Sequence, residues 1–220
     1  MGLLASFFDL LVHLDQHLLA LARDYGGWIY LILFLIIFCE TGLVVTPFLP
    51  GDSLLFVVGT VAAAQAIDVH VAVVLLTLAA VLGNSVNYAV GRWLGARVFQ
   101  SEDSWFFKKA YLERTRRYFE RFGGRTIIIT RFVPIVRTYA PFVAGIGAMN
   151  YARFLLFNVI GAVLWVALLV YAGYLFGSVP VVKNNLTLVI FAIILLSISP
   201  AVFESVSQPA TRLPKVASSW

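Results

Sequence analysis

The chain has 220 residues, 61% of them hydrophobic and 12% charged, with a mean hydropathy of +0.92 and a net charge of +5. Soluble domains have about 45–50% apolar and about 25% charged residues, so this composition excludes a soluble globular protein and predicts an all-α integral membrane protein. The single cysteine excludes an internal disulfide and a cysteine-rich metal site, and we expect neither a metal nor another cofactor.

Residues 1–27 are mostly apolar but carry a polar stripe. Four polar residues recur there at near-helical spacing, namely Asp9, His13, Gln16 and His17. This pattern predicts an amphipathic N-terminal helix that lies in the plane of the membrane. A cleaved signal peptide would need a positively charged start, whereas the first basic residue is Arg23.

Residues 28–67 combine two short apolar arms with a helix break. The arms, 28–46 and 53–67, would measure about 28 Å and about 22 Å as helices, against a hydrocarbon core of about 30 Å. Pro47, Pro50 and Gly51 form the break. We predict a re-entrant hairpin that enters and leaves the membrane on one side. A kinked spanning helix followed by an interfacial helix is the alternative.

Two carboxylates flank this break, Glu40 before it and Asp52 after it. Carboxylates at membrane depth are costly and generally functional. Irregular backbone is not tolerated against lipid, so the break is expected to be buried in protein or to line a wet cavity. We expect Glu40 to carry a proton, and Asp52 to cap the following helix or act as a secondary carrier.

Residues 71–90 are predicted to span the membrane and to complete a first repeat, 28–95. Asn84, Ser85 and Asn87 make this span more polar than lipid contact requires. Residues 96–125 are predicted to form a basic amphipathic helix on the cytoplasmic face, because half of the 16 Lys and Arg residues of the chain cluster there. Nucleic acid binding is disfavoured, since this charge lies between membrane segments.

Residues 126–148 repeat the pattern with the opposite charge. Arg131 and Arg137 lie around a break at Pro134, and Pro141 is a second predicted break, with the second arm beginning near Thr138. Arms of roughly 15 Å cannot span, so we predict a second re-entrant hairpin. A span over 153–176 completes the second repeat, 126–177, and is followed by a last span, 184–203, and a tail, 204–220.

If the basic segment is cytoplasmic, the two hairpins enter the membrane from opposite sides and the tail is cytoplasmic. The repeats then have opposite orientations. Residues 88–95 also echo residues 171–177, and residues 48–50 echo 132–134. Inverted repeats with broken helices that meet near the midplane are typical of secondary transporters.

The chain resembles the bacterial DedA family of inner-membrane proteins, whose domain also occurs in lipid scramblases of the endoplasmic reticulum. The resemblance covers about 28–177. It is carried by Glu40, residues 50–53, Arg131, Pro134, Arg137, Pro141, Ala144, Gly145, Met149, Phe154, Asn158, Gly161 and Trp165. It implies two opposed re-entrant hairpins, dependence on the proton motive force, and transport of lipid phosphates such as undecaprenyl phosphate. It also implies an essential acidic pair at Glu40 and Asp52, and an essential arginine pair at Arg131 and Arg137.

We therefore expect a proton-coupled flippase of a lipid phosphate or phospholipid in the bacterial inner membrane that supports envelope integrity. Arg131 and Arg137 would bind the phosphate. Alternatively, the arginines only neutralise Glu40 and Asp52 and hold the hairpins together. Transport of a small solute or drug, and a structural or assembly role, remain further alternatives. We expect no enzyme, because no histidine follows His70 to serve as nucleophile or acid.

Two glycine pairs, Gly91 with Gly95 and Gly173 with Gly177, suit close contact between helices. Such contacts serve packing within one chain as well as between chains. The sequence thus leaves a homo-oligomer open.

Overall fold

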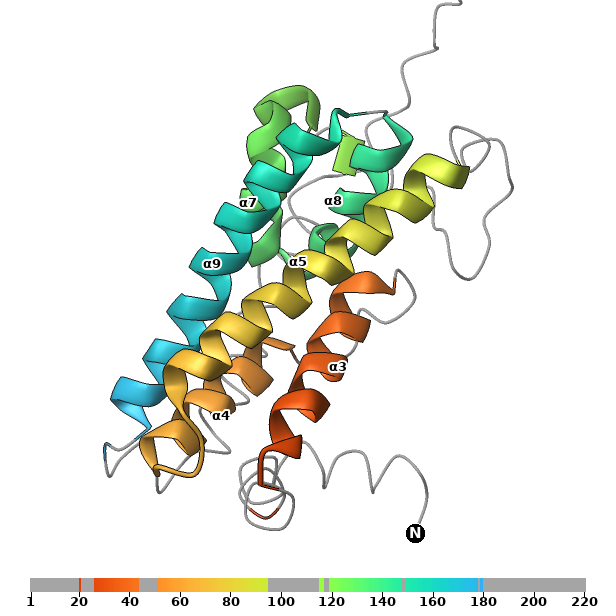
Figure 1. The fold of residues 1–220 in the computed structure, drawn as a ribbon. Coiled ribbons are helices and arrows are strands. Elements are labelled where there is room, and N and C mark those ends of the chain that lie inside the picture. Colours follow the sequence, from red (N-terminus) through yellow and green to blue (C-terminus); the bar gives the residue numbers. More distant parts are fainter. Residues whose placement is uncertain are drawn as a thin grey trace, which may run out of the picture.

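The computed structural model describes residues 26–43, 51–94, 119–147 and 149–177, and residues 20, 115, 116 and 179 as isolated positions. Within these residues all regular structure is helical, which confirms the all-α class. The elements in chain order are α3 (Trp28–Gly42), α4 (Gly51–Ala63), α5 (Val69–Leu94), η2 (Gly123–Arg125), α7 (Thr126–Ile129), η3 (Thr130–Phe132), α8 (Pro134–Ile146) and α9 (Tyr151–Phe176) (Figure 1).

Several predictions from the sequence lie outside the described residues. These are the N-terminal helix apart from residues 20, 26 and 27, most of the basic segment 96–125, the last span 184–203 and the tail 204–220. Pro47 and Pro50 lie outside them as well.

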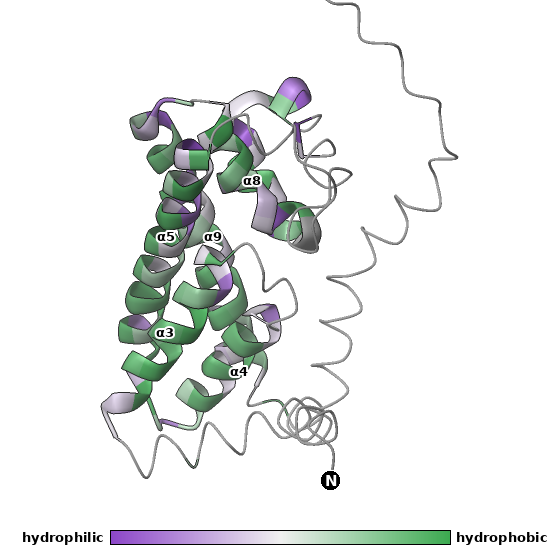
Figure 2. Ribbon diagram, turned by 90° about the vertical axis from the view of Figure 1, so that its right-hand side faces the viewer, coloured by the Kyte–Doolittle hydropathy of each residue, from purple (hydrophilic) through white to green (hydrophobic). Residues whose placement is uncertain are grey.

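Two helices, α5 and α9, have 26 residues each and are strongly apolar. A helix of that length measures about 39 Å, enough to cross a core of about 30 Å. The predicted spans 71–90 and 153–176 lie within them. Figure 2 shows apolar residues along most of both helices, and apolar side chains such as Leu82 and Leu168 are exposed on their outer faces. Both helices therefore have the length and surface of membrane spans.

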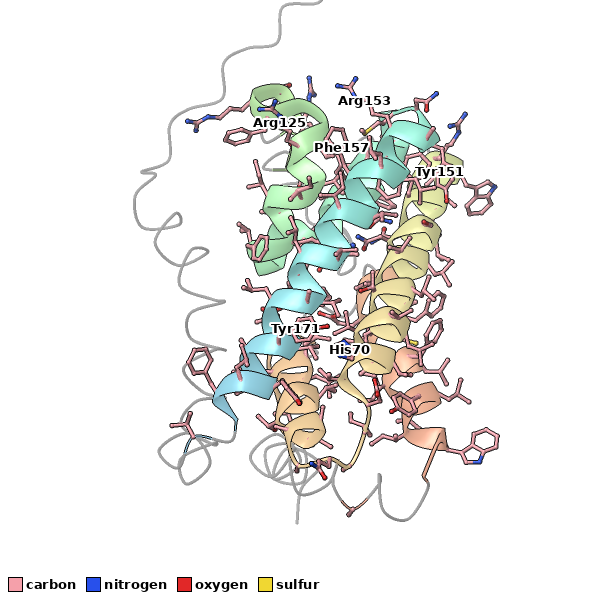
Figure 3. The ribbon with its side chains drawn as sticks, turned by 60° about the vertical axis from the view of Figure 1, so that its left-hand side comes forward. His70, Arg125, Tyr151, Arg153, Phe157 and Tyr171 are labelled. Atoms are coloured by element: carbon pink, nitrogen blue, oxygen red, sulfur yellow. The ribbon has the colours of Figure 1, made fainter. Side chains whose placement is uncertain are left out.

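The long helices run antiparallel and begin at side-chain caps. The Asp68 carboxylate accepts hydrogen bonds from the backbone N–H groups of Val71 and His70 at 2.9 and 2.8 Å. The hydrogen bond from Val71 is the main reason why the pKa of Asp68 lies below its ordinary value of 3.8. The hydrogen bond from His70 and the nearby His70 ring lower this pKa further. Asn150 caps α9 in the same way. Figure 3 shows His70 beside Tyr171 at one end of the pair, where Nδ1 of His70 lies 2.9 Å from the tyrosine hydroxyl.

The first two described helices are too short to cross the membrane. With 15 and 13 residues, α3 and α4 measure about 22 Å and about 20 Å. Their outer ends lie together, since the Tyr30 hydroxyl accepts a hydrogen bond of 2.7 Å from the backbone N–H of Asp68. Their inner ends lie near the middle of α9, because Asp52 contacts Trp165, the fifteenth residue of that helix. The first half of the chain thus reaches the middle of α9 at these inner ends and is back at its starting end of the molecule by Asp68.

The segment 123–146 has the same form from the opposite end of the molecule. Residues of η2 and α7 lead inwards to η3, Val133 has extended backbone, and α8 returns from Pro134. The predicted start of this arm near Thr138 is wrong by four residues, because proline is well tolerated at the first helical position.

The predicted break at Pro141 is also wrong, since Pro141 lies inside α8. Proline removes only its own amide donor. The close packing of α8 on α5 supports the helix on both sides of it. A Cβ on Gly91 would collide with the Phe142 carbonyl, and a Cβ on Gly145 with that of Tyr88.

A matching close contact joins α4 to α9. A Cβ on Gly59 would collide with the backbone of Val170, and a Cβ on Gly173 with that of Phe56. Gly177 likewise packs on Thr60. The described members of the two glycine pairs therefore serve packing within this chain, and Gly95 lies outside the described residues.

The polar residues of α5 also contact neighbouring helices. Asn87 is fully buried and donates a hydrogen bond of 2.9 Å to the backbone carbonyl of Thr138 on α8. Asn84 donates one of 2.9 Å to the side chain of Asn158 on α9. These two asparagines therefore face protein rather than lipid.

Candidate functional site

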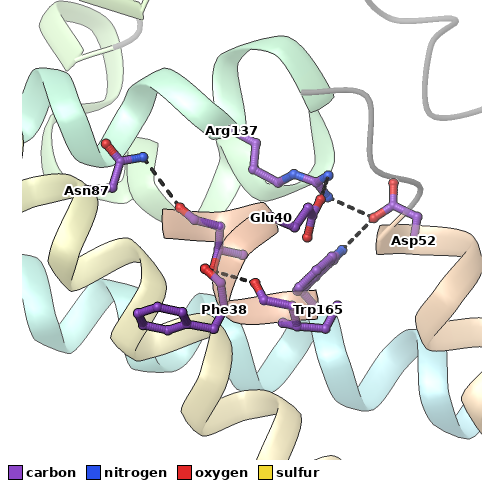
Figure 4. A network of polar contacts seen from close by, with 8 residues as sticks. Phe38, Glu40, Asp52, Asn87, Arg137 and Trp165 are labelled. Atoms are coloured by element: carbon purple, nitrogen blue, oxygen red, sulfur yellow. Dashed lines mark hydrogen bonds and ion pairs between the residues drawn. The ribbon is translucent and has the colours of Figure 1, made fainter. Parts of the chain in front are cut away.

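The centre of the site is a cation held by two carboxylates. Arg137, in the first turns of α8, donates from NH1 to the Asp52 carboxylate at 2.8 Å and from NH2 to the Glu40 carboxylate at 2.5 Å (Figure 4). The three side chains are 10%, 18% and 3% exposed, respectively. They come from the inner ends of three helices that stop at mid-depth. The predicted contact between a carboxylate and an arginine is confirmed for Arg137.

The predicted cap at Asp52 is wrong. Helix α4 begins at Gly51, so Asp52 is its second residue and lies within the first turn rather than at the N-cap. Its carboxylate oxygen Oδ1 accepts hydrogen bonds from Arg137 and from the indole N–H of Trp165. This oxygen of the Asp52 carboxylate therefore binds the buried cation and the indole donor.

Glu40 lies against the start of α4. A Cβ on Gly51 would overlap the Glu40 carboxylate, so the glycine leaves the room that this side chain occupies. The positive end of the α4 dipole favours a negative charge there. The oxygen Oε2 of Glu40 is buried and accepts no hydrogen bond from the described residues. The Glu40 carboxylate is therefore ion-paired through one oxygen and available to a proton through the other.

Trp165 of α9 is a site residue that the sequence analysis placed only in the family resemblance. Its indole N–H donates to Asp52 at 2.8 Å, and its ring lies 5.1 Å from the Arg137 guanidinium carbon and 5.7 Å from that of Arg131. One aromatic face attracts a cation by about 0.5–2 kcal/mol. A lone tryptophan in mid-span, whose N–H needs a partner there, is the signal that could have identified it.

Arg131 of η3 differs from Arg137, because it makes no ion pair with a carboxylate among the described residues. It is 2% exposed, and its NH2 donates to the side-chain oxygen of Asn158 at 2.7 Å. Its Nε and NH1 are buried and make no hydrogen bond to the described residues. The interpretation that the arginines neutralise the two carboxylates therefore accounts for the contacts of Arg137, whereas Arg131 interacts with Glu40 only from a distance and makes its hydrogen bond to an amide.

The remaining predicted break residues lie where the helices start. Gly51 is the first residue of α4 and Pro134 the first residue of α8. Among the residues that the structure describes, no three His, Cys, Asp or Glu side chains are grouped so that they could hold a metal ion. The charged cluster can therefore form ion pairs, donate hydrogen bonds to an anion, and transfer a proton at a carboxylate.

Comparisons with known proteins identify relatives. The family model described as "VTT domain" matches residues 49–175. The chain is 54% identical to "Protein DedA" of Escherichia coli (strain K12) over 93% of its own length and 94% of that protein. It is 41% identical to "Inner membrane protein YqjA" of the same strain over 70% of each chain. It is 45% identical to an "Uncharacterized membrane protein" of Mycobacterium tuberculosis over 78% of its own length and 76% of that protein. No solved structure matches the chain.

Proposed function

Because this chain belongs to the DedA family of VTT-domain membrane proteins, we propose that it is a proton-motive-force-dependent flippase of a lipid phosphate in the bacterial inner membrane. The substrate is undecaprenyl phosphate or a phospholipid, and its movement supports the integrity of the envelope. The observation that carries the proposal is the environment of Arg131. Among the described residues this buried guanidinium has two unsatisfied donors and no ion pair, which suits a phosphate, whose oxygens accept strong charge-assisted hydrogen bonds.

The transport mechanism we propose needs two re-entrant hairpins in an inverted repeat. The return of α3 and α4 to one end, and of the chain through α7 and α8 to the other, supports this arrangement. So does the packing of each returning arm on the long helix of the other half, α4 on α9 and α8 on α5. Broken helices that meet at the midplane place a substrate site within reach of both sides of the membrane.

Proton coupling follows from an exchange of partners at Arg137. A phosphate that binds beside Arg131 competes with Glu40 for the Arg137 guanidinium. Glu40 then loses its cation and gains a neighbouring anion, and both changes favour proton uptake. Departure of the phosphate restores the ion pair and releases the proton. Binding and protonation are linked in this way, with Asp52 as the carboxylate that stays on Arg137.

For the sidedness we propose that the end of the molecule that carries Arg125 and Arg153 is cytoplasmic and the end that carries Asp68 and His70 periplasmic. Figure 3 displays the two arginines at one end and His70 at the other. The C-terminus is then cytoplasmic. Single cysteines at Asp68 and Arg125 should be labelled from opposite sides of intact cells, and labelling from the same side would refute this orientation.

Reconstitution into liposomes with an imposed pH gradient tests the function. We expect gradient-driven movement of labelled polyprenyl phosphate, with labelled phospholipid as the competing substrate. Glu40→Gln imitates the protonated residue, so it should bind the lipid and lose the dependence on the gradient, while Glu40→Asp keeps part of the coupling. Movement of neither lipid would refute the proposal and leave transport of a small solute or drug. Full gradient-driven movement by Glu40→Gln would assign the proton elsewhere.

A further inference from the structure

We infer that Asn158 is a positioning residue for the transported anion, because its uncharged side chain holds Arg131 in place without neutralising it. The inference rests on the proposed function, and it separates the roles of the two arginines. Arg137 is the cation that exchanges carboxylates. Arg131 is the cation that stays available to the phosphate.

The orientation of the Asn158 amide is fixed from three sides. Its Nδ2 donates to the backbone carbonyl of Val81 at 3.0 Å, while its Oδ1 accepts from Asn84 at 2.9 Å and from Arg131 at 2.7 Å. A flipped amide would place a donor against two donors and an oxygen against a carbonyl oxygen. The only arrangement that satisfies all three neighbours presents an oxygen to Arg131. The Val81 carbonyl, which can only accept, thus determines which atom the arginine meets, and the Asn84 amide is oriented to match.

The charge of the partner is the important property. An amide oxygen accepts the hydrogen bond that keeps the guanidinium in one place, but it leaves the positive charge of Arg131 in a buried environment. A carboxylate at position 158 would form the ion pair that Arg137 already has with Glu40 and Asp52. Arg131 makes no ion pair among the described residues, and Glu40, which is paired with Arg137, attracts it only from a distance. Its buried donors therefore favour an anion that can reach them. Asparagine therefore preserves the attraction that aspartate would remove.

Three residues on one face of α9 surround the Arg131 side chain. Residues 158, 161 and 165 lie three and seven positions apart and share a helix face. A Cβ on Gly161 would lie 3.1 Å from both Cδ and Nε of Arg131, and the Trp165 ring lies 5.7 Å from the guanidinium carbon. Asn158 fixes NH2, while the missing side chain at Gly161 lets Arg131 pack closely against α9. The two nitrogens that have no partner among the described residues, Nε and NH1, remain for the anion.

Asn158→Asp tests the inference, since it changes the charge and hardly the size. Binding of undecaprenyl phosphate in detergent is followed by the emission of Trp165 in a protein whose other tryptophans, Trp28, Trp93, Trp105 and Trp220, are replaced by phenylalanine. We expect Asn158→Asp to fold and to raise Kd roughly 10–150-fold, the equivalent of one charge-assisted hydrogen bond. In liposomes KM should rise in the same proportion.

Asn87→Asp is the matched control. Asn87 is also a buried asparagine whose side chain donates to a backbone carbonyl, but it makes no hydrogen bond to Arg131. It should lose similar stability and keep Kd within about threefold of the parent, well below the loss of one hydrogen bond. If Asn158→Asp does not fold, Asn158→Leu tests the inference in its place. Loss of the amide oxygen that accepts from Arg131 should also raise the Kd for undecaprenyl phosphate.

Four results have defined meanings. An unchanged Kd in Asn158→Asp, or in Asn158→Leu where that variant decides, refutes the positioning role while lipid transport by the parent still stands. An equal rise of Kd in Asn87→Asp also refutes it, because any buried carboxylate would then have the effect. If the parent protein neither binds nor moves the lipid, the proposed function fails and this inference fails with it. A rise confined to the Asn158 variants supports it.

Discussion

Removal of Arg137 should destabilise the protein far more than removal of an exposed arginine. Arg137→Met leaves Glu40 and Asp52 without their shared cation, and their side chains are only 3% and 18% exposed. Removing one partner of a buried ion pair costs about 3–5 kcal/mol, because the other charge stays buried without compensation. For a chain of this length that corresponds to a loss of roughly 6–20 °C in the midpoint of thermal unfolding.

A neutral triple variant separates the charge effect from the loss of packing. Replacement of a buried ion pair by neutral groups of similar volume is often neutral or stabilising. Glu40→Gln, Asp52→Asn and Arg137→Met together should therefore recover most of the lost midpoint while transport stays abolished. Arg125→Met is the control, because Arg125 is exposed. The midpoint is measured by size-exclusion chromatography of the detergent-purified protein after heating.

Two results would refute this reasoning. One is an Arg137→Met protein whose midpoint lies close to that of Arg125→Met, which would mean that the two carboxylates do not depend on the cation. The other is a triple variant that is no more stable than Arg137→Met. In that case the arginine side chain would matter for its shape and packing, and not for its charge.

Three further predictions concern other parts of the structure. Trp165→Phe removes a hydrogen bond to a carboxylate, worth about 1.5–3 kcal/mol, and should lower the thermal midpoint by roughly 3–12 °C, whereas Trp93→Phe, at a side chain 84% exposed, should not. Gly173→Ala forces α4 and α9 apart and should cost about 1–3 kcal/mol by chemical denaturation, whereas Gly27→Ala, which meets no atom within 4 Å, should be neutral. Asp68→Asn should lower the midpoint at pH 7, because a carboxylate whose pKa is lowered on folding stabilises the protein above the unfolded value of 3.8. That difference should disappear as the pH falls through the lower folded value, and a constant difference down to pH 2 would contradict it.

The sequence predicted the spanning helices well because spanning is a matter of apolar length. The windows 71–90 and 153–176 lie within α5 and α9, and the helices extend beyond them only as far as their caps, Asp68 and Asn150, allow. The carboxylates and arginines within apolar segments could also be recognised from the sequence as candidate site residues. The free-energy cost of placing a charge in the membrane is high whichever partner it has.

The choice of partners could not be predicted from spacing. Arg131 and Arg137 look equivalent in the sequence, yet one lies in η3 against α9 and the other in α8 between α3 and α4. The break at Val133 separates them, and its position depends on where α8 begins. Pro141 was misjudged for a similar reason, because the packing that surrounds a proline in the membrane decides whether the helix continues.

The crossed packing of the two halves has a consequence for how the protein is made. Helix α4 carries Gly59, whose packing partner Gly173 lies 114 positions later in the chain (173 − 59). The ribosome therefore delivers α4 to the membrane long before α9 exists. During that interval the short helix, with Asp52 in its first turn, has neither its packing surface nor Arg137. The glycine contact and the ion pair can therefore form only after the second half has been synthesised.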